Sequence, residues 1–187
     1  MLLGAVFVLA ALLLLCYNQW DARRAEVSAA QVMKQLEDIL PDQSGETEAA
    51  EQAKTITIDG REYIGYLSIP AVELKLPVLA QWSDDGLKIA PARYSGSLPD
   101  GDLVIAGHNY KKHFSPIKWL DVGAEVDFVD AGDRVWHYQV SSVEELWPEQ
   151  VDAMITETDG EEWDMTLFTC TPGGSARCAV RCVLDEN

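Results

Sequence analysis

Residues 165–183 read Met165-Thr-Leu-Phe-Thr-Cys-Thr-Pro-Gly-Gly-Ser-Ala-Arg-Cys-Ala-Val-Arg-Cys-Val183. Two runs rich in apolar and β-branched residues flank the four-residue turn sequence Pro172-Gly-Gly-Ser175. This pattern predicts a β-hairpin. With that turn, Cys170 lies directly opposite Arg177 on one face of the sheet, because opposed residues of antiparallel strands share a face.

The expected pair of Cys170 and Arg177 also has a chemical meaning. A guanidinium beside a thiol favours the thiolate, which is the nucleophilic form. The same guanidinium can donate hydrogen bonds to an oxyanion that forms on an attacked carbonyl. Arg181 lies opposite Thr166, roughly 13 Å further along the strand, so the spacing favours Arg177. The alternative is a buried structural cysteine beside a surface arginine.

A histidine elsewhere in the chain can serve as the partner of this cysteine. Leu103-Val-Ile-Ala-Gly107 is an apolar run that predicts a strand, and His108 follows it at the start of a loop. Reactive groups are often found where a strand of a rigid scaffold ends in a loop. A cysteine with a histidine distant in sequence is typical of a thiol nucleophile with its acid/base partner. We expect His113 to be solvated in a loop and His137 to be structural within a strand.

Short alternating segments separated by Gly, Pro and Asp turns predict a mainly β fold after residue 54. The expected strands are Thr55–Ile58, Glu62–Ile69, Glu73–Leu79, Asp102–Gly107, Glu125–Val129, Arg134–Ser142, Met165–Cys170 and Ala176–Val183. Many short strands with few helices are typical of a β-barrel or sandwich. Residues 144–164 lack the alternation, and we expect a short helix within a long loop there.

The N-terminal segment differs from the rest of the chain. Residues 1–16 carry no charge, and Tyr17 and Trp20 follow where interfacial aromatic residues belong. No small-x-small cleavage site follows, so we expect an uncleaved transmembrane helix rather than a signal peptide. Leu13 to Leu15 lack the small residue that precedes a lipidated cysteine, which argues against lipidation of Cys16.

Residues 21–40 are expected to form an amphipathic helix that is stopped by Pro41. The apolar positions at helical spacing are Val27, Ala30, Met33, Leu36 and Leu40. Residues 41–53 are polar, acidic and small, which is typical of a flexible linker.

The chain has 187 residues and a formal net charge of −17, which argues against nucleic-acid binding because that function needs a basic face. The acidic residues cluster in residues 37–53 and 141–165. Residues 86–120, around His108, instead hold five basic and two acidic residues. We therefore expect the candidate site to be locally basic.

Together, these motifs resemble those of the bacterial sortases, the cysteine transpeptidases of Gram-positive cell surfaces. Thr166-Leu-Phe-Thr-Cys170 is similar to the family's nucleophile motif, Gly107-His108 to its histidine motif, and Arg177 to its arginine. Further similar segments are Ile64-Gly-Tyr-Leu-Ser-Ile-Pro70, Leu76-Pro-Val78 and Tyr94-Ser-Gly-Ser97. The resemblance covers about residues 62–183, and the histidine and cysteine segments resemble class B-like sortases more than the housekeeping type.

The resemblance implies an all-β fold, a closed eight-stranded β-barrel with short helices behind an N-terminal transmembrane helix. It divides the chain into an anchor (1–20), a juxtamembrane helix and acidic linker (21–54) and a catalytic barrel (55–187). The implied roles belong to Cys170 as nucleophile, His108 as general acid/base and Arg177 as oxyanion stabiliser, with Thr169 and Asn109 in contact with substrate.

The implied reaction cleaves an LPxTG-like sorting signal of a secreted surface protein through an acyl-thioester. The acyl group then passes to an amine of a peptidoglycan precursor or a pilin subunit. No metal or organic cofactor and no nucleic acid is expected to take part. The resemblance also implies that the barrel lies outside the cell, whereas Arg23 and Arg24 would place it in the cytoplasm under the positive-inside rule.

Two other functions stay open at this point. A cysteine endopeptidase or hydrolase would use the same residues without transfer. A zinc module could draw on His108 and three cysteines, Cys170, Cys178 and Cys182, which are suitable ligand types. Cys178 and Cys182, however, are about 13 Å apart along a strand, and we expect them to be small core residues on the face opposite Cys170. The tryptophans expected at the core or rim, or else in a peptide groove, are Trp119, Trp147 and Trp163.

Overall fold

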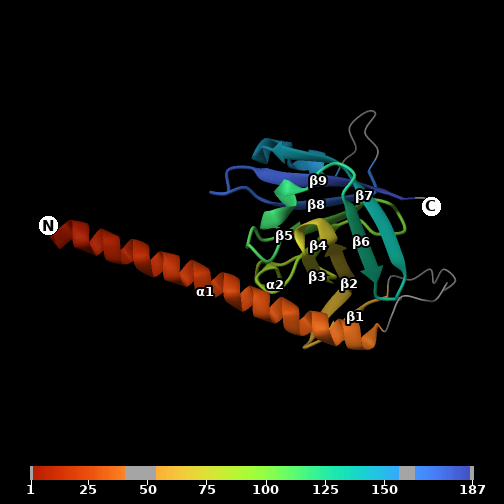
Figure 1. Ribbon diagram of the computed structural model, residues 1–187, viewed down its shortest axis with the longest axis horizontal. Helices are drawn as coiled ribbons and strands as arrows, with labels where there is room; N and C mark the ends of the chain where they lie inside the picture. The colour runs from red at the N-terminus through yellow and green to blue at the C-terminus, as the bar shows by residue number, and fades with distance from the viewer. Residues whose placement is uncertain (1, 41–53, 156–162, 186–187) are drawn as a thin grey trace.

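The computed structural model describes residues 2–40, 54–155 and 163–185 (Figure 1). A single long helix, α1 (Leu2–Ile39), runs along one side of a β-barrel and projects far beyond it. The expected linker, residues 41–53, lies outside the described residues, as do residues 156–162 of the expected long loop.

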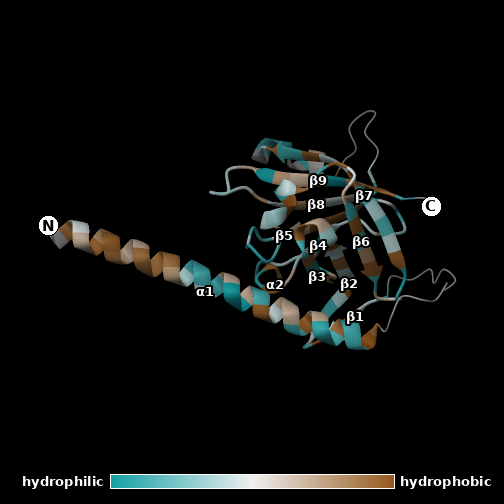
Figure 2. Cartoon of the chain, in the orientation of Figure 1, coloured by the Kyte–Doolittle hydropathy of each residue, from teal (hydrophilic) through white to brown (hydrophobic). Residues whose placement is uncertain are grey.

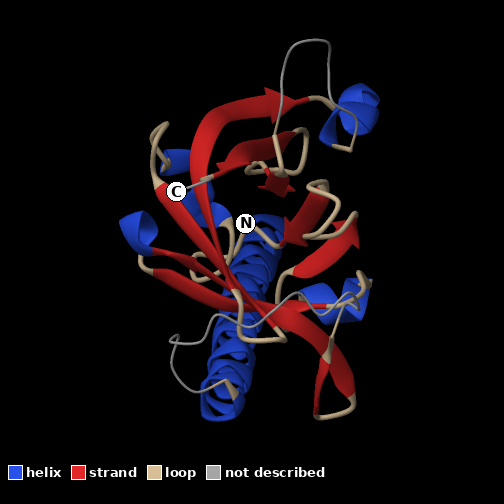
Figure 3. Ribbon diagram, turned by 90° about the vertical axis from the view of Figure 1, so that its right-hand side faces the viewer, coloured by secondary structure: helices blue, strands red, loops and turns tan. Residues whose placement is uncertain are grey.

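Eight strands form a closed ring, because the pairing of β2 with β6 joins the two sides of the sheet. In order around the ring, they are β2 (Arg61–Ile69), β3 (Leu74–Leu79), β4 (Ala92–Ser95), β5 (Leu103–Gly107), β8 (Met165–Cys170), β9 (Arg177–Leu184), β7 (Val135–Leu146) and β6 (Glu125–Asp130). Figure 3 shows these strands curving around a common centre, with α1 alongside. The predicted eight-stranded barrel behind an N-terminal helix is confirmed.

A short additional strand, β1 (Ile56–Ile58), pairs only with β2 and forms the predicted hairpin. Asp59 and Gly60 in its turn have φ values of 48° and 74°. Positive φ at both central residues matches a type I′ turn, which suits the right-handed twist of the two strands. The described residues also contain one short α-helix, α2 (Asp84–Leu87), and three 3₁₀ helices, η1 (Pro70–Val72), η2 (Ser115–Trp119) and η3 (Pro148–Met154).

The barrel interior is an apolar core to which every strand of the ring except the short β4 contributes. On β8, Met165 and Leu167 are fully buried in this core. Phe168 instead joins a second cluster, with Val104 and Ala179, on the opposite face of the sheet. Cys170, two residues further along, shares the face of Phe168, because side chains alternate along a strand.

The C-terminal half of α1 packs on the barrel through a stripe at helical spacing: Ala25, Ala29, Val32, Met33 and Leu36 are all buried. The predicted stripe was right for Met33 and Leu36 but wrong for Val27 and Ala30, which are exposed. Val27 lies about 200° around the helix from Ala25, at ~100° per residue, so the two cannot face the same surface.

The N-terminal half of α1 makes no such contacts, and Figure 2 shows that this part of the helix, which projects beyond the barrel, consists mainly of hydrophobic residues. By length and composition, α1 can cross a membrane. The helix passes the expected boundary at residue 20 without a break, and the division into an anchor and a juxtamembrane helix stays a prediction.

Two parts of the predicted secondary structure need correction. Strand β7 continues to Leu146, where the sequence predicts loop, and η3 follows it as the expected short helix. A register shift between Val140 and Ser142 interrupts the alternation of inward and outward side chains along β7. The residues after the shift therefore do not continue the sequence pattern by which the strand was predicted. Strand β4 was not predicted, and it has only four residues.

Candidate active site

Three neighbouring strands bring the predicted site residues to one edge of the barrel. Strands β5 and β8 are parallel, and Gly107 lies opposite Thr169, so the next residues, His108 and Cys170, leave the two strands side by side. Strands β8 and β9 are antiparallel, with Cys170 opposite Arg177, which confirms the predicted register. Neighbouring strands lie about 4.8 Å apart. Cys170 is therefore flanked by the positions of His108 and Arg177.

The turn after Cys170 is held by hydrogen bonds within its own backbone and side chains. The Gly174 N–H donates to the Thr171 carbonyl at 2.8 Å, and Gly173 has a φ of 88°. Together with Pro172 at the first central position, this is the pattern of a type II turn. The Thr171 hydroxyl also accepts from the Ala176 N–H at 3.1 Å. The turn thus fixes the pairing of Cys170 with β9.

The two arginines of β9 have different environments. Arg177 is half-buried, and its guanidinium donates to the carbonyls of Gly174 and Ala176 at 3.2 and 3.0 Å. Arg181 is buried, donates to Glu144 at 2.7 Å and to Thr166 at 2.8 Å, and also donates to a backbone carbonyl of η3. Arg177 therefore belongs to the edge with Cys170, whereas Arg181 holds η3 and β7 together.

The position of His108 depends on a close contact directly behind it. A Cβ on Gly107 would lie 2.5 Å from the ring of Phe114, which is fully buried. The Phe114 N–H donates to the His108 carbonyl at 3.0 Å and closes the loop on itself. Glycine at position 107 therefore lets this loop pack under the strand and fixes where His108 emerges.

His108 itself is half-buried, and burial lowers the pKa of its imidazole. The Asp21 carboxylate, from α1, opposes this effect and raises the pKa, whereas the Lys88 ammonium lowers it further. A lowered pKa favours the neutral imidazole, which can accept a proton from a thiol or an amine.

The other two histidines differ from each other in environment. His113 was expected to be solvated, but it is fully buried, and burial lowers its pKa to about 4. The loop that carries it folds inward under α1, which the neighbouring lysines in the sequence do not indicate. His137 lies within β7, where it was expected, and its ring lies 2.8 Å from the Asp127 carboxylate.

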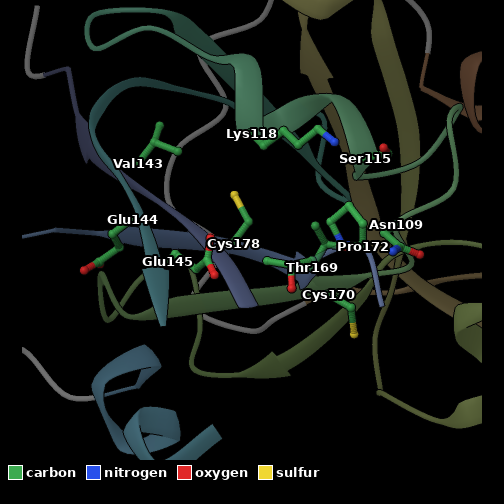
Figure 4. Close-up of a pocket in the computed structure, with 11 residues that line it drawn as sticks. Asn109, Ser115, Lys118, Val143, Glu144, Glu145, Thr169, Cys170, Pro172 and Cys178 are labelled. Atoms are coloured by element: carbon green, nitrogen blue, oxygen red, sulfur yellow. The ribbon is translucent and has the colours of Figure 1, made fainter. Parts of the chain in front are cut away.

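A cavity of about 310 Å³ adjoins Cys170 (Figure 4). Its lining includes both predicted substrate contacts, Thr169 and Asn109. Asn109 is exposed, but Thr169 is 3% exposed and its hydroxyl donates to the Gly107 carbonyl at 2.7 Å. The structure thus assigns Thr169 a contact between strands, and its contact with substrate stays a prediction.

The charge of this cavity differs from the expected basic character of the site. Lys118 lines it from η2, but Glu144 and Glu145 line it from β7. These two carboxylates are distant from His108 in sequence, and they reach the cavity because β7 continues further than predicted. This cavity therefore has mixed charge, and Cys178, whose side chain points away from that of Cys170, also lines it (Figure 4).

Cys178 and Cys182 lie in the barrel core, as predicted. Figure 4 shows the side chains of Cys170 and Cys178 pointing in opposite directions. Cys182 is fully buried, and burial raises its pKa to about 12. Within residues 2–40, 54–155 and 163–185, no three side chains of His, Cys, Asp or Glu cluster as a metal site would require, so the alternative zinc set is not assembled.

A series of aromatic side chains, which the sequence analysis did not predict as part of the site, lies on the sheet near Cys170. Phe168 contacts Tyr94 edge to face at 5.3 Å, and Tyr94 contacts Trp82 in the same way at 6.2 Å. Tyr94 and Trp82 are 40% and 46% exposed. Of the three tryptophans expected at the core or rim, Trp163 is buried, whereas Trp119 and Trp147 are exposed and do not line the cavity.

Comparison with known proteins agrees with this geometry. Residues 67–185 match the family described as the Sortase domain, nearly two thirds of the chain. The chain belongs to the sortase family. It is 26% identical over 169 residues to sortase A of Bacillus anthracis, and the match covers 82% of this chain and 77% of that protein. Sortases are in general cysteine transpeptidases.

Solved structures of sortases share the fold. The sortase D5 transpeptidase of Clostridium perfringens has a TM-score of 0.61 at 17% identity, covering 88% of this chain and 99% of that one. Sortase C1 of Streptococcus agalactiae has a TM-score of 0.59 at 25% identity, covering 85% and 89%. The relatives named here belong to classes A, C and D, so the expected class B-like character gains no support from them.

Proposed function

We propose that this sortase is a membrane-anchored transpeptidase in which Cys170, His108 and Arg177 carry the reaction. The observation that supports this most directly is the register of β5, β8 and β9, which ends all three strands at one edge. The cysteine stands between the histidine and the arginine. These are the positions that a nucleophile needs between its proton-transfer partner and its oxyanion donor.

The first half of the proposed reaction forms a thioester. The Cys170 thiolate attacks the scissile carbonyl carbon, and Arg177 donates hydrogen bonds to the resulting oxyanion. When the C–N bond breaks, the His108 imidazolium gives its proton to the leaving amine. The amino-terminal part of the substrate remains bound to the Cys170 sulfur as an acyl group.

The second half transfers this acyl group. An incoming amine attacks the thioester carbonyl, neutral His108 takes its proton, and the C–S bond breaks to release the Cys170 thiolate. One amide bond is exchanged for another, so the reaction needs no oxidant, reductant or metal. The acceptor class is an amine of a peptidoglycan precursor or a lysine of a pilin subunit.

The proposed first substrate is an LPxTG-like sorting signal of a secreted surface protein. The exposed aromatic rings of Trp82 and Tyr94, which continue to Phe168, offer an apolar surface for its Leu-Pro portion. Phe168 and Cys170 lie two residues apart on the same face of β8, so a peptide on this surface would reach the sulfur.

We further propose that residues 2–20 of α1 hold the protein in the membrane, with the barrel outside the cell. Secreted substrates would then meet the catalytic edge on the side where sorting signals appear. Protease protection of a reporter fused to the C-terminus tests this orientation, because an external barrel leaves the reporter accessible in intact cells.

The assignment of the nucleophile is tested with the full chain in detergent, incubated with a library of sorting-signal peptides. Intact mass and peptide mapping should place the acyl group on Cys170. Cys170→Ala should form no acyl-enzyme, and Cys178→Ala, the matched control on the neighbouring strand, should keep forming it. An acyl-enzyme in Cys170→Ala would contradict the proposal.

Transfer and hydrolysis are separated by adding a small amine such as triglycine to the same assay. A transpeptidase yields the amide product at the expense of the hydrolysed peptide as the amine concentration rises. If the hydrolysed peptide is the sole product at every amine concentration, the protein is a cysteine hydrolase that uses the same three residues.

A further inference from the structure

Helix α1 reaches the candidate active site directly after its hydrophobic segment. The Tyr110 hydroxyl donates to the Asp21 carboxylate at 2.5 Å, a contact between residues 89 positions apart in the sequence. Asp21 follows Trp20, which is the last residue of the expected anchor. The loop after His108 is thus tied to the helix at the point where the helix leaves its hydrophobic part.

Tyr110 also contacts His108. The two rings lie 4.8 Å apart between centroids, with an angle of 34° between their planes. On another side, the Tyr110 ring lies 5.5 Å from the ring of His113, which is fully buried near the Ala25 backbone of α1. The Tyr110 ring is therefore held between the imidazole of the candidate site and a buried residue under the helix.

Several charged groups act on His108 from the elements packed around it. The Asp21 carboxylate of α1 and the Asp84 carboxylate of α2 both raise its pKa, whereas Lys88, at the end of α2, lowers it. Lys88 is itself paired with Asp85 at 2.9 Å. Burial is the main effect on the His108 pKa and lowers it, and Asp21 is the strongest of the opposing charges.

We propose that Tyr110 and Asp21 are positioning residues for His108, so that the anchor helix supplies part of the active site. Tyr110 fixes the plane of the imidazole, and Asp21 fixes Tyr110 and places a negative charge near the ring. This inference rests on the proposed role of His108 in proton transfer. It adds two residues, one of them outside the barrel, to the groups that determine how this enzyme transfers protons.

A purely structural role for the pair would be to dock α1 on the barrel. The stripe from Ala25 to Leu36 already provides that docking through five buried apolar side chains. Glu37 near the end of α1 adds an ion pair with Lys75 at 2.6 Å. Removal of the Asp21–Tyr110 bond should therefore leave the fold intact, and its effect on His108 can be measured separately.

The test uses the full chain in detergent micelles with two substitutions at this contact. Asp21→Asn keeps a hydrogen-bond acceptor for Tyr110 but removes the charge. Tyr110→Phe keeps the ring and the Asp21 charge but removes the hydrogen bond. Glu26→Gln is the matched control, because it removes an exposed carboxylate from the same helix. The readouts are the NMR titration of His108 in histidine-labelled protein and the dependence of kcat and KM on pH.

We expect Asp21→Asn to lower the titration midpoint of His108 and to shift the corresponding limb of the kcat profile in the same direction. We expect Tyr110→Phe to lower kcat by about tenfold, part of the ~10²–10⁴-fold that a positioned acid–base group supplies, while KM stays unchanged. Glu26→Gln should match the unsubstituted chain in both readouts.

The proposal is overturned if both variants keep the original His108 midpoint and the original kcat. A loss of thermal stability alone would then assign the contact to docking of the helix. Failure of the proposed function would be recognised separately, because the unsubstituted chain would itself be inactive with peptide and amine. The NMR titration does not depend on activity, so it decides the effect of Asp21 in either case.

Discussion

Thr169 and Gly107 are paired between the parallel strands β8 and β5, and the Thr169 hydroxyl donates to the Gly107 carbonyl at 2.7 Å. Each residue comes directly before one of the two groups proposed to share a proton, Cys170 and His108. This buried bond therefore ties the two strands together at their last common position. It sets the separation of the two groups through the backbone.

Replacement of Thr169 by valine removes this bond at nearly constant shape. We expect the free energy of unfolding to fall by about 1 kcal/mol, the net contribution of a typical intramolecular hydrogen bond. We also expect kcat to fall with little change in KM. Urea unfolding and steady-state kinetics measure both, and Thr169→Ser, which keeps the hydroxyl, is the control. A rise in KM without loss of stability would instead support the predicted contact of Thr169 with substrate.

Substitution of the two arginines of β9 should separate chemistry from stability. Arg177→Ala should lower kcat by about 10²–10³-fold, as expected for the loss of an oxyanion donor, with an unchanged melting temperature. Arg181→Ala removes a buried side chain with its hydrogen bonds to Glu144, Thr166 and η3, and should destabilise the fold by about 1–3 kcal/mol. Thermal unfolding and single-turnover acylation compare the two variants. If Arg177→Ala acylates at the original rate, the proposed oxyanion role is wrong.

Gly107→Ala tests the close contact behind His108. The new Cβ would meet the Phe114 ring at 2.5 Å, so we expect a loss of about 1–3 kcal/mol from overpacking and a fall in kcat as His108 is displaced. The double variant Gly107→Ala with Phe114→Leu makes room for the methyl group and should recover part of the activity. Equal kcat in the single and double variants would argue against this contact as the cause.

The buried His113 predicts a loss of stability in acid. Its pKa of about 4 in the folded protein lies below the usual 6.5, so the unfolded chain binds the proton more tightly. The contribution of His113 to stability is therefore complete above pH 6.5. It declines as the pH falls toward 4, by up to about 3 kcal/mol.

This effect is measured as the difference between the unsubstituted chain and His113→Leu in urea unfolding from pH 7 to pH 4. The variant should lose less stability over that range. His137→Gln is the control for the loss of an exposed histidine, and it should lose more stability from pH 7 to pH 4 than His113→Leu does. Identical pH dependence of all three proteins would mean that His113 does not control the acid limb.

The aromatic surface beside Cys170 predicts a binding effect. Tyr94→Ala should raise KM for a sorting peptide several-fold, because removal of a partly exposed aromatic contact costs about 1 kcal/mol of binding. Trp119→Ala removes a more exposed ring, 74% accessible, that is not part of the Trp82–Tyr94–Phe168 series, and should leave KM unchanged. The opposite result would place the peptide on the Trp119 side of the barrel.

The C-terminal hairpin shows how much local sequence can determine. Its turn residues and its two strands lie within 20 positions, so the register of Cys170 with Arg177 follows from the turn length alone. The strand before His108 was equally easy to predict, because four consecutive apolar residues, Leu103 to Ala106, are followed by Gly107. These two segments carry all three proposed catalytic residues, and the closed barrel followed from the resemblance to a known family.

The surroundings of His108 could not be predicted in the same way. The contact of Asp21 with Tyr110 joins residues 89 positions apart, and no local pattern marks either one. His113 lies beside two lysines and is nevertheless buried, because the packing of α1 covers its side chain. The Asp21 carboxylate of α1 that acts on His108 is also far away in sequence, so the local excess of basic residues could not indicate it.

The unbroken helix α1 would also set the height of the proposed reaction above a bilayer. If residues 2–20 span the membrane, Asp21 lies at the level of the lipid headgroups, and His108, linked to it through Tyr110, lies close to that level. A substrate that is itself held in the membrane would then reach Cys170 by lateral diffusion, which turns the encounter into a search in two dimensions. A truncated protein that lacks α1 would instead have to reach the same substrate by diffusion from bulk solution.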